Sequence, residues 1–323
     1  MYIAILNIMK HKLMKNLPTL VITGGTGLVG TRLIQRIADH YQIYILTRGK
    51  SEDTNQVKYI KWNIKAKEIE LDKLPSEVDI IINLVGAGIA DKRWTEARKQ
   101  VLIDSRVKST EFLFEVFKSR KVKTYIGASA IGYYGDRGEE LLTADSDPGK
   151  DGFLSKCCVL WEESSQLFKP VVDHHYILRI GIVLSEQGGA LPKLILPSKL
   201  GGAGYFGDGS AYYSWIHIDD LCNTIEFLIN ESPPSRAYNG VSPLPIPLKE
   251  FMRGIKKVYA PYALLLPIPV FAVKLAMGEM VSMLTNSDRV IPQHLEAAGH
   301  KFEYADIDRA LRHIKEEKVE LGY

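Results

Sequence analysis

The sequence predicts an α/β fold, a doubly wound parallel sheet of the Rossmann type with a smaller, mainly helical C-terminal substrate lobe. Two observations lead to this prediction. The first half of the 323-residue chain alternates apolar strand-like runs with helix-like stretches, a rhythm typical of parallel sheets covered by helices on both faces. A glycine-rich turn, Thr23–Gly30, separates the first strand-like run from the first helix-like stretch. In such folds this turn is where a dinucleotide binds.

Six apolar runs are expected to be strands. Runs rich in Ile, Val and Leu are typical of strands buried on both faces of a parallel sheet. They span residues 20–23, 43–46, 57–62, 79–84, 124–129 and 176–184. Stretches with helical spacing of apolar residues lie between them, at 31–40, 95–120 and 153–168. We therefore assign residues 18–185 to a dinucleotide-binding core.

After residue 185 the alternation stops, and glycine-rich loops, a proline cluster and helical tracts follow. We expect residues 186–323 to form the smaller lobe over the ligand crevice, with residues 211–245 completing part of the core sheet. The apolar stretch 259–284 is interrupted by three prolines and a lysine, so no run reaches the roughly 20 residues of a spanning helix. We expect a loop and a buried amphipathic helix there, and no stable membrane insertion.

Composition favours a soluble cytoplasmic protein, with 46% hydrophobic residues, 24% charged residues and a net charge of +3. So small a net charge argues against nucleic-acid binding, which needs clustered basic residues. The three cysteines have no metal-ligand spacing, which indicates a reducing compartment and no metal site. Residues 1–17 contain lysines and no acid. We expect a disordered tail or an over-called start codon there, with an organelle-targeting segment as the alternative.

The glycine turn carries a G-x-x-G-x-x-G pattern at Gly24, Gly27 and Gly30. A tight turn needs a residue that tolerates positive φ, and a diphosphate needs backbone without Cβ atoms in its way. The helix that follows offers free N–H groups and a partial positive charge to the phosphates. We expect these glycines to bind the cofactor together with their neighbours Thr23, Leu28 and Val29.

The end of the second strand predicts which dinucleotide binds. NAD sites usually hold the ribose 2′-hydroxyl with Asp or Glu there, but this chain has Arg48. A guanidinium grips phosphate bidentately, so we expect NADP(H) in preference to NAD(H). Asn63 is placed either to meet the adenine edge or to cap its loop. Leu84 and Gly86 follow the strand at 79–84 and should pass beneath the cofactor.

The residues described so far resemble the extended short-chain dehydrogenase/reductase superfamily, from about Leu20 to the C-terminus. A narrower resemblance, to the group called "epimerase family" proteins, depends on several motifs in order. They are residues 88–94, Ser105-Arg106, 132–136, Trp161-Glu162, 214–220 and 292–299. This resemblance implies NADP(H) binding and a small C-terminal domain, and it leaves the substrate open.

Superfamily chemistry, as the resemblance implies it, uses a Ser or Thr and a Tyr-x-x-x-Lys pair. Ser129 matches the serine if one residue is inserted; otherwise Ala130 takes that place. Lys156 falls near the expected lysine, as a catalytic and ribose-binding residue or as a solvated charge. Gly152 stands where the tyrosine belongs, so Tyr133 or Tyr134 is the candidate phenol, with substrate contact or packing as alternatives.

Four further residues are candidate substrate contacts. Lys92 and Arg93 lie in a charged loop that either meets an anionic substrate or is solvated. Arg179 lies near the end of the sixth strand, where the superfamily places substrate-facing groups. His217 opens a later helix, as a substrate contact or as a structural clasp between the lobes.

Two functions are consistent with these residues. One is an NADP(H)-binding, epimerase-like oxidoreductase acting on a small carbonyl compound or a nucleotide-sugar, as a monomer or homodimer. The other is a cofactor-binding regulator or scaffold that lacks hydride transfer, which the missing tyrosine favours. A membrane-associated division factor is a third possibility.

Overall fold

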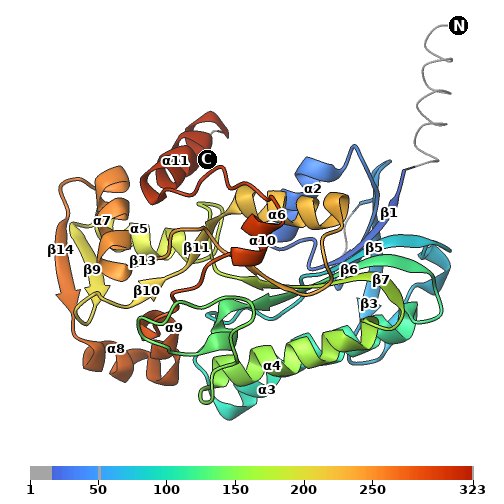
Figure 1. Cartoon of the computed structure of the whole chain (residues 1–323), viewed down its shortest axis with the longest axis horizontal. Helices are drawn as coiled ribbons and strands as arrows, with labels where there is room; N and C mark the ends of the chain where they lie inside the picture. Colours follow the sequence, from blue (N-terminus) through green and yellow to red (C-terminus); the bar gives the residue numbers. More distant parts are fainter. Residues whose placement is uncertain (1–16, 50–51, 322–323) are drawn as a thin grey trace, which may run out of the picture.

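A computed structural model of the chain describes residues 17–49 and 52–321 (Figure 1). Apart from Leu17, the predicted N-terminal extension therefore lies outside the described residues. A sheet of eight strands in the order β12-β7-β6-β5-β1-β2-β3-β4 forms the centre of the fold. Every pairing in it is parallel except that of β3 with β4. This is a Rossmann-type sheet, as the sequence predicts.

The chain enters the sheet at its middle and builds outwards in both directions. Strand β1 (Thr19–Thr23) lies between β2 (Gln42–Thr47) and β5 (Val78–Asn83). The order of strands reverses at β1, and open α/β sheets bind ligands in the crevice outside the carboxyl ends of the strands at such a point. The remaining strands of this sheet are β3 (Val57–Asn63), β4 (Glu68–Ile69), β6 (Val122–Ala130), β7 (Val172–Ile180) and β12 (Ala237–Gly240).

Helices cover both faces of the sheet, which explains why its central strands β1, β2 and β5 are buried at nearly every position (Figure 1). Helices α2 (Leu28–Ile37) and α6 (Ile218–Glu231) pack together on one face and bury a shared apolar cluster with the sheet. Helices α3 (Glu96–Phe117) and α4 (Phe153–Ser165) lie together on the other. Short 3-10 turns follow several elements, at η1 (Leu71–Lys73), η2 (Ile131–Tyr134) and η3 (Gln166–Phe168).

The predicted strand at 176–184 is two strands that belong to different sheets. Strand β7 ends at Ile180, and β8 (Ile182–Leu184) pairs instead with β11 (Trp215–His217). The break is at Gly181, where a Cβ would lie 2.6 Å from the Ser214 carbonyl oxygen. The close approach of these two backbones turns the chain out of the main sheet.

The C-terminal lobe contains more strands than the sequence predicts. Helices α5 (Leu191–Lys199), α7 (Leu248–Tyr259) and α11 (Ile307–Leu321) contribute to its apolar core. Short pairs of strands complete it, namely β9 (Gly202–Phe206) with β14 (Leu264–Ile268) and β10 (Tyr212–Tyr213) with β13 (Ile246–Pro247). Strands of two to five residues carry too little periodicity to be found among glycines and prolines.

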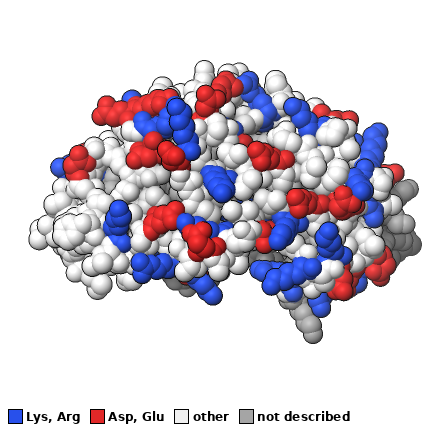
Figure 2. Space-filling model, turned by 90° about the horizontal axis from the view of Figure 1, so that it is seen from below, with Lys and Arg blue, Asp and Glu red and all other residues white. Residues whose placement is uncertain are grey.

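The prediction of a loop followed by a buried amphipathic helix at 259–284 misses a strand and is wrong about burial. The segment contains strand β14, helix α8 (Val270–Met277), η4 (Gly278–Val281) and α9 (Ser282–Thr285), before α10 (Gln293–Ala297). No residue of α8 is buried, and Phe271 and Leu275 are 76% and 83% exposed. Figure 2 shows few charged side chains at the end of the molecule where β14 and α8 lie in Figure 1. Among the described helices, none combines the length and apolar character that crossing a membrane requires.

Candidate functional site

The turn between β1 and α2 leaves the amino end of the helix open to a ligand. Gly27 is the N-cap residue, no side chain caps the helix, and no acidic residue lies in its first turn. The first backbone N–H groups of the helix, on Leu28 and Val29, therefore have no side-chain acceptor. Such groups and the helix dipole together favour an anion.

The three glycines of the G-x-x-G-x-x-G pattern occupy positions where Cβ atoms would interfere. Gly24 has a φ of +69°, and a Cβ there would lie 2.8 Å from the Leu84 carbonyl carbon. A Cβ on Gly30 would lie 2.4 Å from the Gly24 carbonyl oxygen. A Cβ on Gly27 would have the Gly24 carbonyl oxygen as its single neighbour within 4 Å, at 3.2 Å. A side chain there would therefore extend into the open space at the amino end of α2. The turn thus fits a dinucleotide diphosphate.

Thr23 supports this turn from below rather than facing a cofactor. Its hydroxyl donates to Asn83 Oδ1 at 2.6 Å, and both side chains are fully buried. The Asn83 amide in turn donates to Thr110 and Tyr125. The Thr23 side chain therefore does not face a cofactor, contrary to the expectation from the sequence, because its hydroxyl joins β1 to β5.

Arg48 lies exposed just beyond β2, at the end of the site where an adenosine ribose would lie. It makes no ion pair with any residue in the described ranges. A hollow beside it is lined by Thr47, Gly49, Glu52, Tyr59, Lys61, Glu70 and Lys73. Asn63 lies away from this lining, and its Oδ1 accepts a hydrogen bond from the Ala66 N–H at 3.3 Å. Asn63 thus caps its loop, the alternative that the sequence left open.

A second hollow, here called the crevice, lies at the carboxyl ends of β6 and β7 between α4 and the C-terminal lobe. Its volume is about 210 Å³. The lining is largely apolar, with a few polar groups from distant parts of the chain. They include Arg106, Tyr212, Ser214, Asn286 and Asp288. Apolar walls with a small number of convergent polar groups are typical of small-molecule sites.

Helix α4 turns an apolar face to the crevice, formed by Leu154, Cys157, Cys158 and Trp161. Lys156 lies on another face of the helix, exposed beside a separate hollow that is lined by both acids and lysines, among them Glu279 and Lys99. Lys156 therefore lies outside the crevice lining, and its contact with a cofactor ribose stays a prediction. Neither a phenol nor an ammonium group enters the crevice from α4.

Ser129 and Tyr134, two of the expected catalytic residues, belong to a buried network outside the crevice lining. Ser129 donates to Glu162 Oε1 at 2.6 Å, and Tyr134 donates to Asn239 Oδ1 at 2.6 Å. Both side chains are buried, with exposures of 2% and 0%. Ala130 lines the crevice instead, because successive strand residues point to opposite faces of a sheet.

Arg179 joins the members of this network and donates to four acceptors inside the protein. It pairs with both oxygens of Glu162, at 2.8 and 2.9 Å, and donates to the Tyr134 hydroxyl at 3.0 Å. Its guanidinium carbon lies 3.5 Å from the centre of the Tyr133 ring. Tyr133 therefore packs against Arg179, and the expected substrate contact at Arg179 is replaced by a structural ion pair.

Arg106 is the cation that does reach the crevice. It donates to the Leu102 and Ala87 carbonyl oxygens and stacks on Trp161, with its guanidinium carbon 4.9 Å from the ring centre. Within the described ranges it has no carboxylate partner. Burial lowers the pKa of Arg106, yet an arginine stays protonated at neutral pH. Lys92 and Arg93, the predicted substrate contacts, are exposed and lie outside the crevice lining.

Asp288 is the crevice residue that sequence reasoning missed. It is a single acid in a loop between α9 and α10, and no motif or periodicity distinguishes it in the sequence. Its Oδ1 atom is buried without a hydrogen-bond partner among the described residues. Burial, with a smaller contribution from Asp136, raises the pKa of Asp288 to about 8. Such a carboxyl is protonated at neutral pH.

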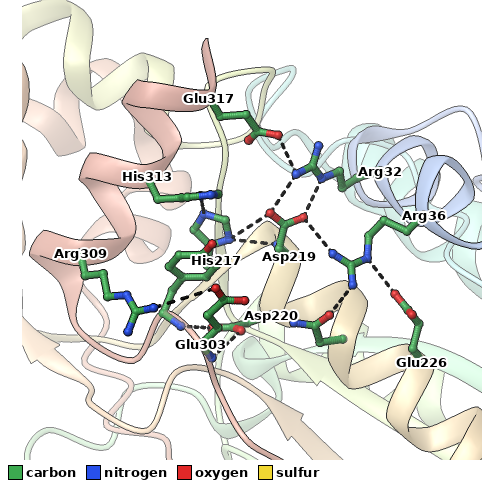
Figure 3. A network of polar contacts seen from close by, with 12 residues as sticks. Arg32, Arg36, His217, Asp219, Asp220, Glu226, Glu303, Arg309, His313 and Glu317 are labelled. Carbon is green, nitrogen blue, oxygen red and sulfur yellow. Dashed lines mark hydrogen bonds and ion pairs between the residues drawn. The ribbon is translucent and has the colours of Figure 1, made fainter. Parts of the chain in front are cut away.

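His217 is absent from the crevice lining and joins α6 to α11 (Figure 3). It caps α6 by accepting the Asp219 N–H at 3.0 Å, stacks on Tyr304 at 4.0 Å, and lies 3.2 Å from His313 of α11. Its side chain is fully buried, so the geometry agrees with the clasp and not with a substrate contact. Burial lowers the pKa of His217 to about 3.

The same histidines and Asp219 could in principle surround a metal ion, since their ligand atoms lie within 4.8 Å of one another. The carboxylate is already paired, however. Arg32 donates to both Asp219 oxygens, at 2.6 and 2.8 Å. A guanidinium this close repels a cation and occupies the lone pairs it would need, so the cluster fits an ion-paired clasp (Figure 3).

Comparison with known proteins agrees with this geometry. Residues 20–154 match the NAD dependent epimerase/dehydratase family, and residues 268–314 match a domain of unknown function. An epimerase family protein of Staphylococcus aureus is 36% identical over 308 residues, which cover 92% of this chain and 99% of that protein. The chain belongs to the epimerase family. The resemblance inferred from the sequence motifs is thereby confirmed.

Solved structures of epimerase family members share the fold. The human epimerase family protein SDR39U1, in a structure with NADPH, has a TM-score of 0.82 and 25% identity, covering 92% of this chain and 99% of that one. A nucleoside-diphosphate sugar epimerase from Corynebacterium glutamicum has a TM-score of 0.72 and 30% identity, covering 92% of this chain and 58% of that one. Binding of a nicotinamide dinucleotide is thus a property of the family.

Proposed function

We propose that this protein is an NADP(H)-dependent oxidoreductase that interconverts a small carbonyl compound and its alcohol. The observation that carries the proposal is the open amino end of α2, where Gly24, Gly27 and Gly30 leave room for a diphosphate. The crevice lies at the same edge of the sheet, at the ends of β6 and β7. One extended cofactor on this edge could reach both places.

The preference for NADP(H) depends on Arg48. It is exposed at the end of β2 without an ionic partner among the described residues, and a ribose 2′-phosphate offers its guanidinium a bidentate acceptor. The human neighbour with NADPH supports the same choice. Lys61 lines the adjacent hollow, where Lys73 is paired with Glu70.

The size of the crevice favours a small carbonyl compound over a nucleotide-sugar. Its volume of about 210 Å³ lies below the roughly 300–1,000 Å³ of most ligand pockets. Arg106 suits a substrate that carries a carboxylate or phosphate, because a buried cation without a carboxylate partner gains from an anionic ligand. Trp161 and Leu154 exclude water from the same wall.

A bound nicotinamide dinucleotide supplies the two electrons and one hydrogen that reduce a carbonyl carbon. The residues of this chain hold the diphosphate at α2, orient the substrate through Arg106, and keep the reacting atoms in an apolar surrounding. In such a surrounding the interaction of Arg106 with an anion is stronger than in water.

Fluorescence titration with NADPH and NADH tests the proposal, followed by a panel of small carbonyl acids under NADPH. We expect tighter binding of NADPH than of NADH, and loss of that preference in Arg48→Ala, since a bidentate phosphate pair contributes at least about tenfold in affinity. Tight binding without turnover across the panel would support the regulator instead. No affinity for either dinucleotide would overturn the proposal.

A further inference from the structure

Asp288 is held in place at the wall of the crevice by its own backbone. Its N–H donates to the Tyr212 carbonyl oxygen at 3.0 Å, and its carbonyl oxygen accepts from the Ser214 hydroxyl at 2.5 Å. Both partners line the crevice as well. Asp288 is therefore held at the crevice wall by a fixed segment, although the segment itself has no regular structure.

The carboxyl group of Asp288 has no partner of its own. No described residue forms an ion pair with it, and Oδ1 is buried without a hydrogen bond. An ionised carboxylate in such a place would cost several kcal/mol of desolvation. The nearby acid Asp136 adds repulsion, and its Oδ1 accepts the Ser287 N–H at 3.2 Å. Both effects raise the pKa of Asp288, to about 8, so that the group is neutral at rest.

The other titratable groups around the crevice are less suited to move a proton near neutral pH. Burial raises the pKa of Cys157 and brings that of Cys158 to about 12. Burial, followed by the Asp288 charge, raises the pKa of Tyr213, and its hydroxyl already donates to the Leu284 carbonyl oxygen at 2.8 Å. Arg106 stays protonated. The Tyr212 ring lies against Arg289, 4.9 Å from its guanidinium carbon.

We propose that Asp288 is the proton donor and acceptor of the crevice, in the role that the superfamily gives to the tyrosine that this chain lacks at Gly152. The inference rests on the proposed function and names the acid of that reaction. Catalytic acids and bases are found where burial and like charges are combined in a cleft, and Asp288 has both.

During reduction the carbonyl carbon receives one hydrogen and two electrons from NADPH, which becomes NADP⁺. The carbonyl oxygen takes the proton of the Asp288 carboxyl, so that one O–H bond forms on the product alcohol and one breaks on the acid. The Asp288 carboxylate then recovers a proton from water. In the oxidation direction the carboxylate accepts the alcohol proton.

The test compares the wild type with Asp288→Asn, which keeps the shape of the side chain and removes its proton transfer. Asp208→Asn is the matched control, since Asp208 is an exposed acid outside the crevice lining. Carbon-13 NMR of aspartate-labelled protein follows the carboxyl titrations directly. We expect one carboxyl that titrates near pH 8 in the wild type and in Asp208→Asn, and its absence in Asp288→Asn.

Turnover provides the second measurement. We expect Asp288→Asn to bind NADPH with unchanged affinity and to lose roughly 100-fold or more in kcat on the carbonyl panel, the usual contribution of general acid catalysis. Wild-type reduction should be constant below about pH 8 and fall above it, because the acid must carry its proton. Asp136→Asn removes the repelling charge, so the fall should begin at a lower pH.

Three results would overturn the inference. An Asp288 carboxyl that is ionised at neutral pH lacks the proton to donate. Wild-type turnover in Asp288→Asn shows that another group moves the proton. If the wild type binds NADPH but reduces no member of the panel, the proposed function fails and the catalytic role of Asp288 fails with it. If turnover persists in Asp288→Asn, only the catalytic role of Asp288 fails.

Discussion

Arg32 of α2 and Asp219 of α6 form a two-point ion pair, with Nε–Oδ1 at 2.6 Å and Nη2–Oδ2 at 2.8 Å. The pair joins the helix that begins at the glycine turn to the helix capped by His217 (Figure 3). Glu317 of α11 also pairs with Arg32, at 2.6 Å. One guanidinium thus connects the dinucleotide-binding half of the core to the C-terminal helix.

Asp219→Asn should lower the free energy of unfolding by about 2–4 kcal/mol, since it leaves Arg32 partly buried without its main partner. The solvent contact of Arg32 keeps the loss below that of a fully enclosed pair. Urea denaturation measures it. The control is Glu250→Gln, which breaks an exposed pair with Arg253 and should cost less than about 1 kcal/mol. Equal losses in the two variants would contradict this account.

Gly27→Ala should weaken NADPH binding by about tenfold or more, because the added methyl extends into the space that a diphosphate needs. Stability should change little, since the new Cβ has one close neighbour at 3.2 Å. Gly202→Ala is the control, because a Cβ there has nothing within 4 Å. Fluorescence titration and thermal unfolding separate the two effects. Unchanged NADPH affinity in Gly27→Ala would contradict the proposed site.

Tyr134→Phe should reduce stability without removing turnover. The hydroxyl satisfies Asn239 and Arg179 inside the protein, and an unpaired buried polar group costs about 1–3 kcal/mol. Tyr262→Phe, which removes an exposed hydroxyl bonded to the Lys199 carbonyl oxygen, is the control for loss of one phenol. A folded Tyr134→Phe variant with no turnover would restore Tyr134 as the catalytic phenol.

The protein should become less stable as the pH falls from about 6.5 towards 3. Burial lowers the pKa of His217 from 6.5 to about 3 and that of His300 to about 4. In the unfolded chain these imidazoles take up protons below 6.5, whereas in the folded protein they stay neutral, so acid favours unfolding. Urea midpoints measured from pH 7 to 4 should fall less steeply in His217→Gln than in the wild type. Parallel curves would exclude His217 as a contributor.

The three cysteines should resist alkylation in the native protein. All are buried, and burial raises the pKa of Cys158 and Cys222 to about 12 and that of Cys157 in the same direction. The reactive thiolate is therefore scarce at neutral pH. Mass spectrometry after iodoacetamide should find no label on the folded protein and three labels after denaturation. Rapid labelling of Cys157 or Cys158 would indicate a more open crevice.

Local signals predicted most of the strands of the core and the glycine turn before α2. The strands at 20–23, 43–46 and 79–84 were found within one or two residues of β1, β2 and β5, because a strand buried on both faces is apolar at every position. The lobe was predicted less well. The sequence predicts a loop and a buried helix where strand β14 and the exposed helix α8 lie. An apolar composition does not tell which partner, if any, covers a segment.

The catalytic residues show the limit of sequence reasoning most clearly. The prediction of Ser129 depends on an inserted residue, and a shift of one residue in a strand moves a side chain to the opposite face. The structure has Ala130 on the crevice and Ser129 against Glu162. For Arg179, Tyr134 and His217 the sequence indicated polar groups near strand ends, yet each is saturated by partners from distant segments.

By itself, the sequence determined the alternating sheet, the glycine turn before α2 and the family, because backbone conformation and periodicity depend on neighbours along the chain. The tertiary structure alone decided which side chains meet in the crevice. Arg106, Trp161 and Asp288 come from three distant segments, and the burial that keeps a carboxyl protonated arises only when those segments pack together.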